Sequence, residues 1–318
     1  MATPIRTDTL DRLAPGSRVA VIRLRSLGDS VLSTPAIHLL KQARPDLQIG
    51  VVVEERFAGV FESNPDIAEV LAPTARALRG FAPDLCVNLH GGIRSARLTL
   101  LSGARMRAGF DIFRPAWIYN TPIPTAQETL GVARRVHTAE HMASAVFYLG
   151  VPIVEVPRAR LHVAEGRSPH APAGPYAVIH PLAATPEKTW PAPLFFELAR
   201  RIRQSFDLEP VFVGGPGEDL APFSNWRTVS GAPLREVARL MREAALFVGN
   251  DSGPAHVAAA FGIPEVVFFG PSDADVWAPW RTGAAVLKAE GPIETLTIDR
   301  AMAAVERQIA HVESRETS

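Results

Sequence analysis

Segments typical of buried β-strands alternate with segments of helical periodicity along most of this chain. In the first half, apolar runs at 18–24, 47–53 and 85–89 are each followed by a helical pattern, the second of these at 54–65. Consecutive parallel strands need a crossover that is usually a helix, so this order favours a parallel sheet covered by helices. The chain is therefore predicted to be an α/β protein.

The same alternation restarts after residue 175. The stretch from Arg158 to Pro175 is rich in Pro, Gly and Ser and lacks periodicity, which predicts a linker. A chain of 318 residues also exceeds what one hydrophobic core usually supports. We therefore predict two Rossmann-like domains, residues 1–165 and 166–318. Ligands bind at the carboxyl ends of the strands in such sheets, so the two domains are expected to face each other across a cleft.

Composition and charge narrow the classes of function. Apolar residues make up 47% and charged residues 21%, as in soluble globular proteins. The net charge of +0 gives no indication of a nucleic-acid partner. Residues 1–160 carry 19 Lys and Arg against 14 Asp and Glu, and the remainder carries the reverse excess. A basic first half favours an anionic ligand or membrane face, although ordinary surface variation explains the same difference.

The N-terminus and the single cysteine carry little functional information. The first 16 residues are charged and lack the apolar region of a signal peptide, and no apolar run reaches membrane-spanning length. A cytoplasmic location is expected. Cys86 lies in an apolar strand-like setting, which predicts an inert buried thiol.

The first candidate site is the sequence FVGNDSGPAHVAAAFGIP at 247–264. A strand ends before Asp251, and Ser252, Gly253 and Pro254 lead directly into a small-residue helix. Backbone N–H groups at a helix start attract phosphate, and a glycine lets a ligand approach the backbone closely. His256, in the first turn, is placed to reach the same phosphates. A short, well-capped helix without a ligand explains the same residues.

A similar junction occurs in the first half, in RLRSLGDSVLSTPA at 23–36. Asp29 opens a helix just after a strand, and Pro35 either kinks that helix or marks its start. Asp29 is either a helix cap or a carboxylate directed into the cleft as a general base. The flanking Arg23 and Arg25 favour its ionised form.

Other polar residues follow strand ends. Lys188, before a helix in the second half, is either a phosphate partner or a solvated loop lysine. Glu218 lies in a glycine-rich turn that does not match the dinucleotide-binding fingerprint. Asp273 and Asp275 form an Asp-x-Asp pair, but two carboxylates are a thin shell for a divalent cation and the pair is common in turns.

Four blocks taken together resemble a known family: RLRSLGDSVLSTPA, HPLAATPEKTWP, VGGPGEDL and VGNDSGPAHVAAAFGIPEVVFFGPSD. In this order, over about residues 18–280, they are similar to the ADP-heptose:lipopolysaccharide heptosyltransferases, which have the GT-B fold. The resemblance implies inverting transfer of a heptose from ADP-heptose to an acceptor of the lipopolysaccharide core type. It also implies that no cofactor and no catalytic metal are needed.

The resemblance also implies roles for individual residues. Asp29 would be the general base, and Lys188 would stabilise the departing diphosphate as the second catalytic residue. The residues expected to bind the donor are Lys188, Glu218, Asp251, Ser252, Gly253 and His256. Those expected to bind the acceptor are Arg25, His90 and Arg94. The first domain would then bind the acceptor and the second the nucleotide sugar.

These assignments define the expected partners and the alternatives. The partners are an ADP-sugar donor and an anionic glycolipid acceptor, with peripheral contact with the inner membrane left open. One alternative is a glycosyltransferase that uses another nucleotide sugar. Another is a non-catalytic protein that binds nucleotide sugars. A nicotinamide oxidoreductase is disfavoured because the glycine fingerprint is missing.

Overall fold

Two six-stranded parallel sheets form the framework of the chain, one in each of two compact units, residues 1–162 and 163–318. The structure is a computed structural model that describes residues 5–316, with side chains described as far as residue 311. Residues 1–4 and 317–318, the outer ends of the two predicted domains, lie outside the described range. The chain from residue 151 to residue 175 has no regular secondary structure.

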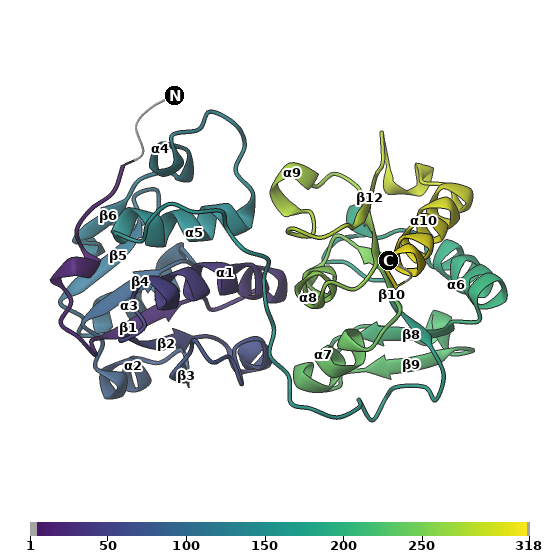
Figure 1. Cartoon of the computed structure of the whole chain (residues 1–318), viewed down its shortest axis with the longest axis horizontal. Helices are drawn as coiled ribbons and strands as arrows, with labels where there is room; N and C mark the ends of the chain where they lie inside the picture. Colours follow the sequence, from purple (N-terminus) through teal and green to yellow (C-terminus); the bar gives the residue numbers. More distant parts are fainter. Residues whose placement is uncertain (1–4, 317–318) are drawn as a thin grey trace. The chain divides into compact units, whose positions relative to one another are not determined.

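The sheet of the first unit has the strand order β3-β2-β1-β4-β5-β6, and all its strand pairs are parallel. Its strands are β1 (Arg18–Ile22), β2 (Gln48–Val52), β3 (Glu69–Leu71), β4 (Leu85–Asn88), β5 (Met106–Phe110) and β6 (Thr121–Ile123). Its α-helices are α1 (Leu27–Ala43), α2 (Ala75–Phe81), α3 (Gly92–Leu101), α4 (Ala126–Leu130) and α5 (Thr138–Leu149). Helices α1 and α5 pack against each other (Figure 1).

The second unit repeats this topology with the order β12-β11-β10-β7-β8-β9. Its strands are β7 (Tyr176–His180), β8 (Glu209–Gly214), β9 (Arg227–Ser230), β10 (Leu246–Asn250), β11 (Glu265–Phe269) and β12 (Ala285–Lys288). Its α-helices are α6 (Ala192–Phe206), α7 (Leu234–Arg242), α8 (Gly253–Phe261), α9 (Ala274–Trp277) and α10 (Ile298–Glu316). In each unit the order is that of the Rossmann fold, so the direction of winding reverses between the first and fourth strands.

Two local predictions need correction or refinement. The segment 54–65 is not an α-helix: a 3₁₀ helix spans Glu55–Val60, and Ser63 has a positive φ of 59° that ends helical geometry. By contrast, α1 runs continuously through Pro35, which therefore does not mark its start. Proline has no N–H for the carbonyl of Val31, and the Thr34 hydroxyl donates to that carbonyl instead, at 2.8 Å.

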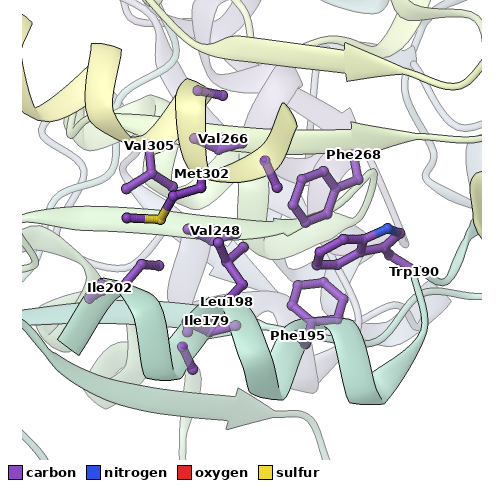
Figure 2. Close-up of a cluster of buried hydrophobic side chains, with 14 of the residues drawn as sticks. Ile179, Trp190, Phe195, Leu198, Ile202, Val248, Val266, Phe268, Met302 and Val305 are labelled. Carbon is purple, nitrogen blue, oxygen red and sulfur yellow. The ribbon is translucent and has the colours of Figure 1, made fainter. Parts of the chain in front are cut away.

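An aromatic cluster dominates the core of the second unit (Figure 2). Trp190 packs against Phe195 and Phe268, with ring centroids 5.1 and 4.5 Å away. Its indole N–H donates to the Leu296 carbonyl at 2.9 Å, and its backbone N–H donates to Asn250 Oδ1 at 3.0 Å. The core therefore fixes the backbone two residues beyond Lys188.

Candidate functional site

The predicted site residues gather at the point in each sheet where the winding reverses. In the first unit, Asp29 and His90 follow the neighbouring strands β1 and β4. In the second, His180 ends β7 and Asp251 follows the neighbouring strand β10. Ligands of open parallel sheets bind in the crevice outside the carboxyl ends of the strands at this point. Topology alone thus brings these residues together within each unit.

The central feature of the second unit is an ion pair between Lys188 and Asp251. Lys188 Nζ lies 3.1 Å from Asp251 Oδ2, and the carboxylate side chain is 8% exposed while the lysine side chain is 33% exposed. The lysine ends a 3₁₀ turn, Pro186–Lys188, that packs closely on the end of β11. A Cβ at Gly270 would lie 2.5 Å from the Glu187 carbonyl oxygen. The lysine is thus anchored at the edge of the sheet, while about a third of its side chain stays accessible.

A second chain of polar contacts passes through His180, which is buried. Its Nδ1 is 3.1 Å from Ser252 Oγ, and its Nε2 is 3.3 Å from Glu218 Oε2. Glu218 Oε2 also accepts from the Gly215 N–H at 2.6 Å. The contact with His180 lowers the pKa of Glu218, although burial opposes the shift. His180 therefore links the residue expected at the diphosphate to the residue expected at the nucleoside.

The start of α8 has the geometry expected of an anion site. Ser252 precedes the helix with an extended backbone, and Pro254 occupies the first turn. The Ser252 side chain does not cap the helix but contacts His180 and the Asn250 carbonyl. His256 is buried within the first turn. The first N–H groups of a helix lack intrahelical partners, and together with the helix dipole they favour an anion.

In the first unit, Asp29 is held by two side chains on one oxygen. Asp29 Oδ2 lies 2.5 Å from Arg23 Nη2 and accepts from Ser26 Oγ at 3.0 Å. Arg23 is buried, and its Nη1 donates to the Leu89 carbonyl at 2.7 Å, which ties it to the end of β4. Burial lowers the pKa of Arg23, while the neighbouring Asp29 opposes that shift. Both contacts involve Oδ2, so neither of them occupies Oδ1 of Asp29.

The three predicted acceptor residues differ in their surroundings. His90 is partly buried, and burial, then the positive charges of Arg23 and Arg25, lower its pKa. Arg25 is exposed. Arg94 Nη1 lies 2.5 Å from Glu54 Oε1 in an exposed ion pair. His90 and Arg25 thus share the electrostatic surroundings of Asp29, whereas Arg94 is engaged by an acid of its own.

The Asp-x-Asp pair has a structural role. Asp273 precedes α9, and its Oδ1 accepts from the Asp275 N–H at 3.0 Å, which caps the helix. Among residues 5–316 there is no cluster of three or more His, Cys, Asp or Glu side chains arranged to hold a metal ion. Within the same range, no helix combines the length and apolar character needed to cross a membrane.

Two histidines near the sites were not assigned to a site from the sequence. One is His180, which joins Ser252 to Glu218. His141, on α5, stacks on Phe110 with ring centroids 4.1 Å apart, and burial lowers its pKa to about 4. The position of His180 at a strand end was a usable signal. Nothing in the sequence around His141 separates it from an ordinary helix residue. Cys86 is buried as predicted, and burial raises its pKa to about 12.

Two Rossmann-type sheets with polar clusters at their winding reversals are the framework of the GT-B fold, and comparison with known proteins identifies the family. Residues 72–299 match the family described as glycosyltransferase family 9 (heptosyltransferase), and the chain belongs to that family. It is 27% identical over 298 residues to lipopolysaccharide heptosyltransferase 3 of Escherichia coli, covering 81% of this chain and 84% of that protein.

Solved structures share the fold along nearly the whole chain. A glycosyl transferase family 9 protein from Veillonella parvula aligns with a TM-score of 0.81 and 22% identity, covering 96% of this chain and 99% of the other. The E. coli heptosyltransferase WaaC with ADP aligns with a TM-score of 0.74 and 20% identity, covering 92% and 99%. The chain is thus an enzyme, a glycosyltransferase with the GT-B fold.

Proposed function

We propose that this enzyme transfers a heptose from ADP-heptose to a hydroxyl of a lipopolysaccharide core-type acceptor, with inversion at the anomeric carbon. The observation that carries the proposal is the ammonium group of Lys188 beside Asp251 at the start of α8. This arrangement suits a diphosphate that gains negative charge as it departs. The related WaaC structure contains ADP, which supports ADP as the nucleotide.

In this proposal the second unit binds the donor. The diphosphate lies against Lys188 and the backbone amides at Ser252 and Gly253, with His256 in the same turn. Glu218 binds the ribose hydroxyls through its carboxylate, which His180 and the Gly215 N–H hold in place. Asp251 fixes the lysine and faces the sugar. Lys188 and the helix start stabilise the ADP leaving group without a metal ion.

Asp29 of the first unit is the proposed general base. A sugar hydroxyl is a weak nucleophile until its proton is being removed, and a positioned carboxylate accepts that proton in the transition state. Arg23 and Ser26 both hold Oδ2, so Oδ1 is the atom assigned to receive the proton. Attack from the face opposite the diphosphate then inverts the anomeric carbon. Arg23 is a positioning residue, since it acts through Asp29.

The acceptor in this proposal is an anionic glycolipid bound by the first unit. His90 and Arg25 lie in the surroundings of Asp29 and are assigned to the acceptor saccharide together with Arg94. The net excess of five positive charges in residues 1–160 suits an acidic acceptor. A cytoplasmic location, with contact at the inner membrane, belongs to the same proposal.

Replacing Lys188 is expected to weaken the binding of ADP. In Lys188→Met the stem of the side chain is kept but the charge on the diphosphate is lost, and affinity for ADP should fall at least about tenfold, roughly 1.4 kcal/mol. Isothermal titration calorimetry measures the change. Lys288→Met, an exposed lysine on the edge strand β12, is the matched control and should leave the affinity unchanged. Unchanged ADP affinity in Lys188→Met removes Lys188 from the donor site.

A ligand panel tests the proposed function as a whole. Thermal unfolding is measured with ADP, GDP, UDP and NAD, and a ligand at about 100 times its dissociation constant adds about 2.7 kcal/mol of apparent stability. Selective stabilisation by ADP is expected, followed by ADP release when ADP-heptose and a core acceptor are mixed. ADP binding without turnover would favour a non-catalytic binding protein. Preference for another nucleotide would overturn the ADP-sugar donor.

A further inference from the structure

Large apolar side chains are exposed on one part of the first unit, along α3 and the connection from β5 to β6. Trp117 is 72% exposed and Ile93 is 71% exposed, the highest values among the large apolar residues with exposed side chains. Ile112, Leu100 and Leu101 add to the same region at 59%, 39% and 37%. Scattered single exposures are ordinary in soluble proteins, whereas exposed apolar side chains that gather in one region are typical of interaction sites.

The outward face of α3 carries apolar and basic residues together. Ser95, Ala96, Leu98 and Thr99 are buried, which fixes the inner face of the helix. Ile93, Arg97 and Leu100 are spaced by four and three residues, so they line up on the opposite, exposed face. A soluble helix usually presents only polar residues there. The outer face of α3 is therefore more apolar than the solvent-exposed face of a helix usually is.

The exposed residues of the β5–β6 connection lie next to this helix. Ala96 of α3 forms a buried cluster with Ile118 and Tyr119, and Phe113 packs on it. The 3₁₀ turn Ala116–Ile118, which includes Trp117, therefore sits beside α3. We call the combined set the α3 surface: Ile93, Arg97, Leu100, Leu101, Ile112, Arg114 and Trp117.

The charge around the α3 surface has one sign. Residues 90–120 contain five arginines and a single acid, Asp111. Arg97, Arg105 and Arg114 are exposed. The guanidinium of Arg114 donates to the carbonyls of Asp111 and Phe113 and not to a carboxylate. Exposed tryptophan and aliphatic side chains set among arginines are the combination that lies in the interface of an anionic bilayer.

We propose that the α3 surface docks the enzyme on an anionic lipid bilayer. The inference deepens the proposed function, on which it rests for the lipid nature of the acceptor. Helix α3 begins at Gly92, two residues after His90, at the sheet edge where Asp29 lies. A membrane against α3 therefore brings the head group of a lipid-linked acceptor to the same edge as the proposed base.

Vesicle binding tests the docking surface. The full chain is co-sedimented with vesicles of phosphatidylcholine alone and with vesicles that also contain phosphatidylglycerol. Binding to the anionic vesicles is expected, and salt should weaken it. Trp117→Ser should reduce partitioning about tenfold or more, as burial of one large apolar side chain implies. Arg97→Gln and Arg114→Gln should each reduce it about fivefold.

Matched controls come from the second unit. Trp277→Ser changes a less exposed tryptophan, 36% exposed on α9, and Arg235→Gln changes an exposed arginine on α7. Both should bind vesicles like the unchanged protein. Quenching of tryptophan fluorescence by brominated phosphatidylcholine, lost in Trp117→Phe, would place Trp117 itself in the bilayer.

The outcomes separate this proposal from the proposed function. No binding to anionic vesicles, or equal loss in test and control variants, overturns the docking surface. So does a dimer of the chain that Trp117→Ser dissociates while vesicles are not bound, because a second copy then covers the face. Turnover of a water-soluble acceptor without a lipid tail measures the transfer reaction alone. Failure of that assay counts against the proposed function, whereas failure of vesicle binding counts only against the α3 surface.

Discussion

The Asp29→Asn variant is expected to lose nearly all transferase activity while it still binds ADP. The amide keeps the size of the side chain but cannot accept the hydroxyl proton, so kcat should fall by about 10²–10⁴-fold. Donor binding is assigned to the second unit and should remain within error of the unchanged enzyme. Steady-state kinetics and calorimetry with ADP measure the two quantities separately.

The surroundings of Asp29 require a control for folding. Arg23 is buried, and removal of its partner charge leaves a guanidinium without compensation, at a cost of about 3–5 kcal/mol. Asp29→Glu keeps the negative charge but moves the carboxylate by one methylene. It should remain folded and still lose about 10²-fold in kcat, because displacement by about 1 Å is enough.

A second aspartate provides the matched comparison. Asp66 is also a partly buried carboxylate of the first unit and lies 2.7 Å from His38 Nδ1. Asp66→Asn should leave kcat unchanged, whatever it does to stability. Wild-type turnover in Asp29→Asn would exclude Asp29 as the base, and equal losses in both variants would point to damage to the fold.

The second large effect concerns stability against pH, through Glu265 at the start of β11. Its side chain is fully buried, and Oε1 accepts from Thr282 Oγ1 at 2.7 Å. Oε2 has no hydrogen-bond partner in the part of the chain that the structure describes. Burial raises the pKa of Glu265 to about 8, above its ordinary value of 4.5. The folded protein therefore holds a proton that the unfolded chain releases over that interval.

The sign of the effect follows from this proton. The stability contributed by protonated Glu265 is fully present below pH 4.5 and is lost as the pH rises through about 8. The loss in free energy of unfolding is up to about 5 kcal/mol. Glu265→Gln keeps an acceptor for Thr282 and does not titrate, so its stability should not fall in this window. Denaturant unfolding of both proteins from pH 5 to pH 8.5 measures the difference.

Glu209 offers the control for this experiment. It begins the parallel strand β8, but its carboxylate is paired with Arg227 at 2.9 Å at the surface. Glu209→Gln should follow the pH profile of the unchanged protein. Contributions from other groups, such as His141, are common to all three proteins and cancel in the comparison. Parallel profiles for wild type and Glu265→Gln would show that Glu265 is not protonated in the folded state near neutral pH.

Most of the fold and much of the candidate site followed from the sequence. Strand–helix alternation predicts parallel sheets, and residues just after strands β1, β4, β7 and β10 must then meet at one edge of each sheet. This is why the positions of Asp29 and Asp251 just after strands were enough to predict that they lie at these edges, whereas His90 was assigned through the family resemblance. The α/β class, the GT-B fold and the family are confirmed by the comparisons. The roles given to single residues remain predictions.

What the sequence did not reveal depends on local turns and on contacts between distant residues. The segment 54–65 carries helical periodicity, but local turns at Ser63 and Asn64 prevail over it. The link from Ser252 through His180 to Glu218 joins residues up to 72 positions apart. The position of Trp117 beside α3 depends on the packing of the β5–β6 connection. Periodicity reports which face of an element is buried, but not which distant side chain meets it.

In the proposed donor site, the anchoring of Trp190 gives the hydrophobic core a part in ligand recognition. The indole packs among aromatic rings, and the backbone N–H of Trp190 is bonded to Asn250, so the backbone two residues beyond Lys188 is held before any nucleotide binds. A lysine on a free loop would lose that freedom on binding, at an entropic cost to affinity. In the proposed site, that entropy is already lost when the chain folds. A substitution that loosens the aromatic packing is therefore expected to weaken nucleotide binding.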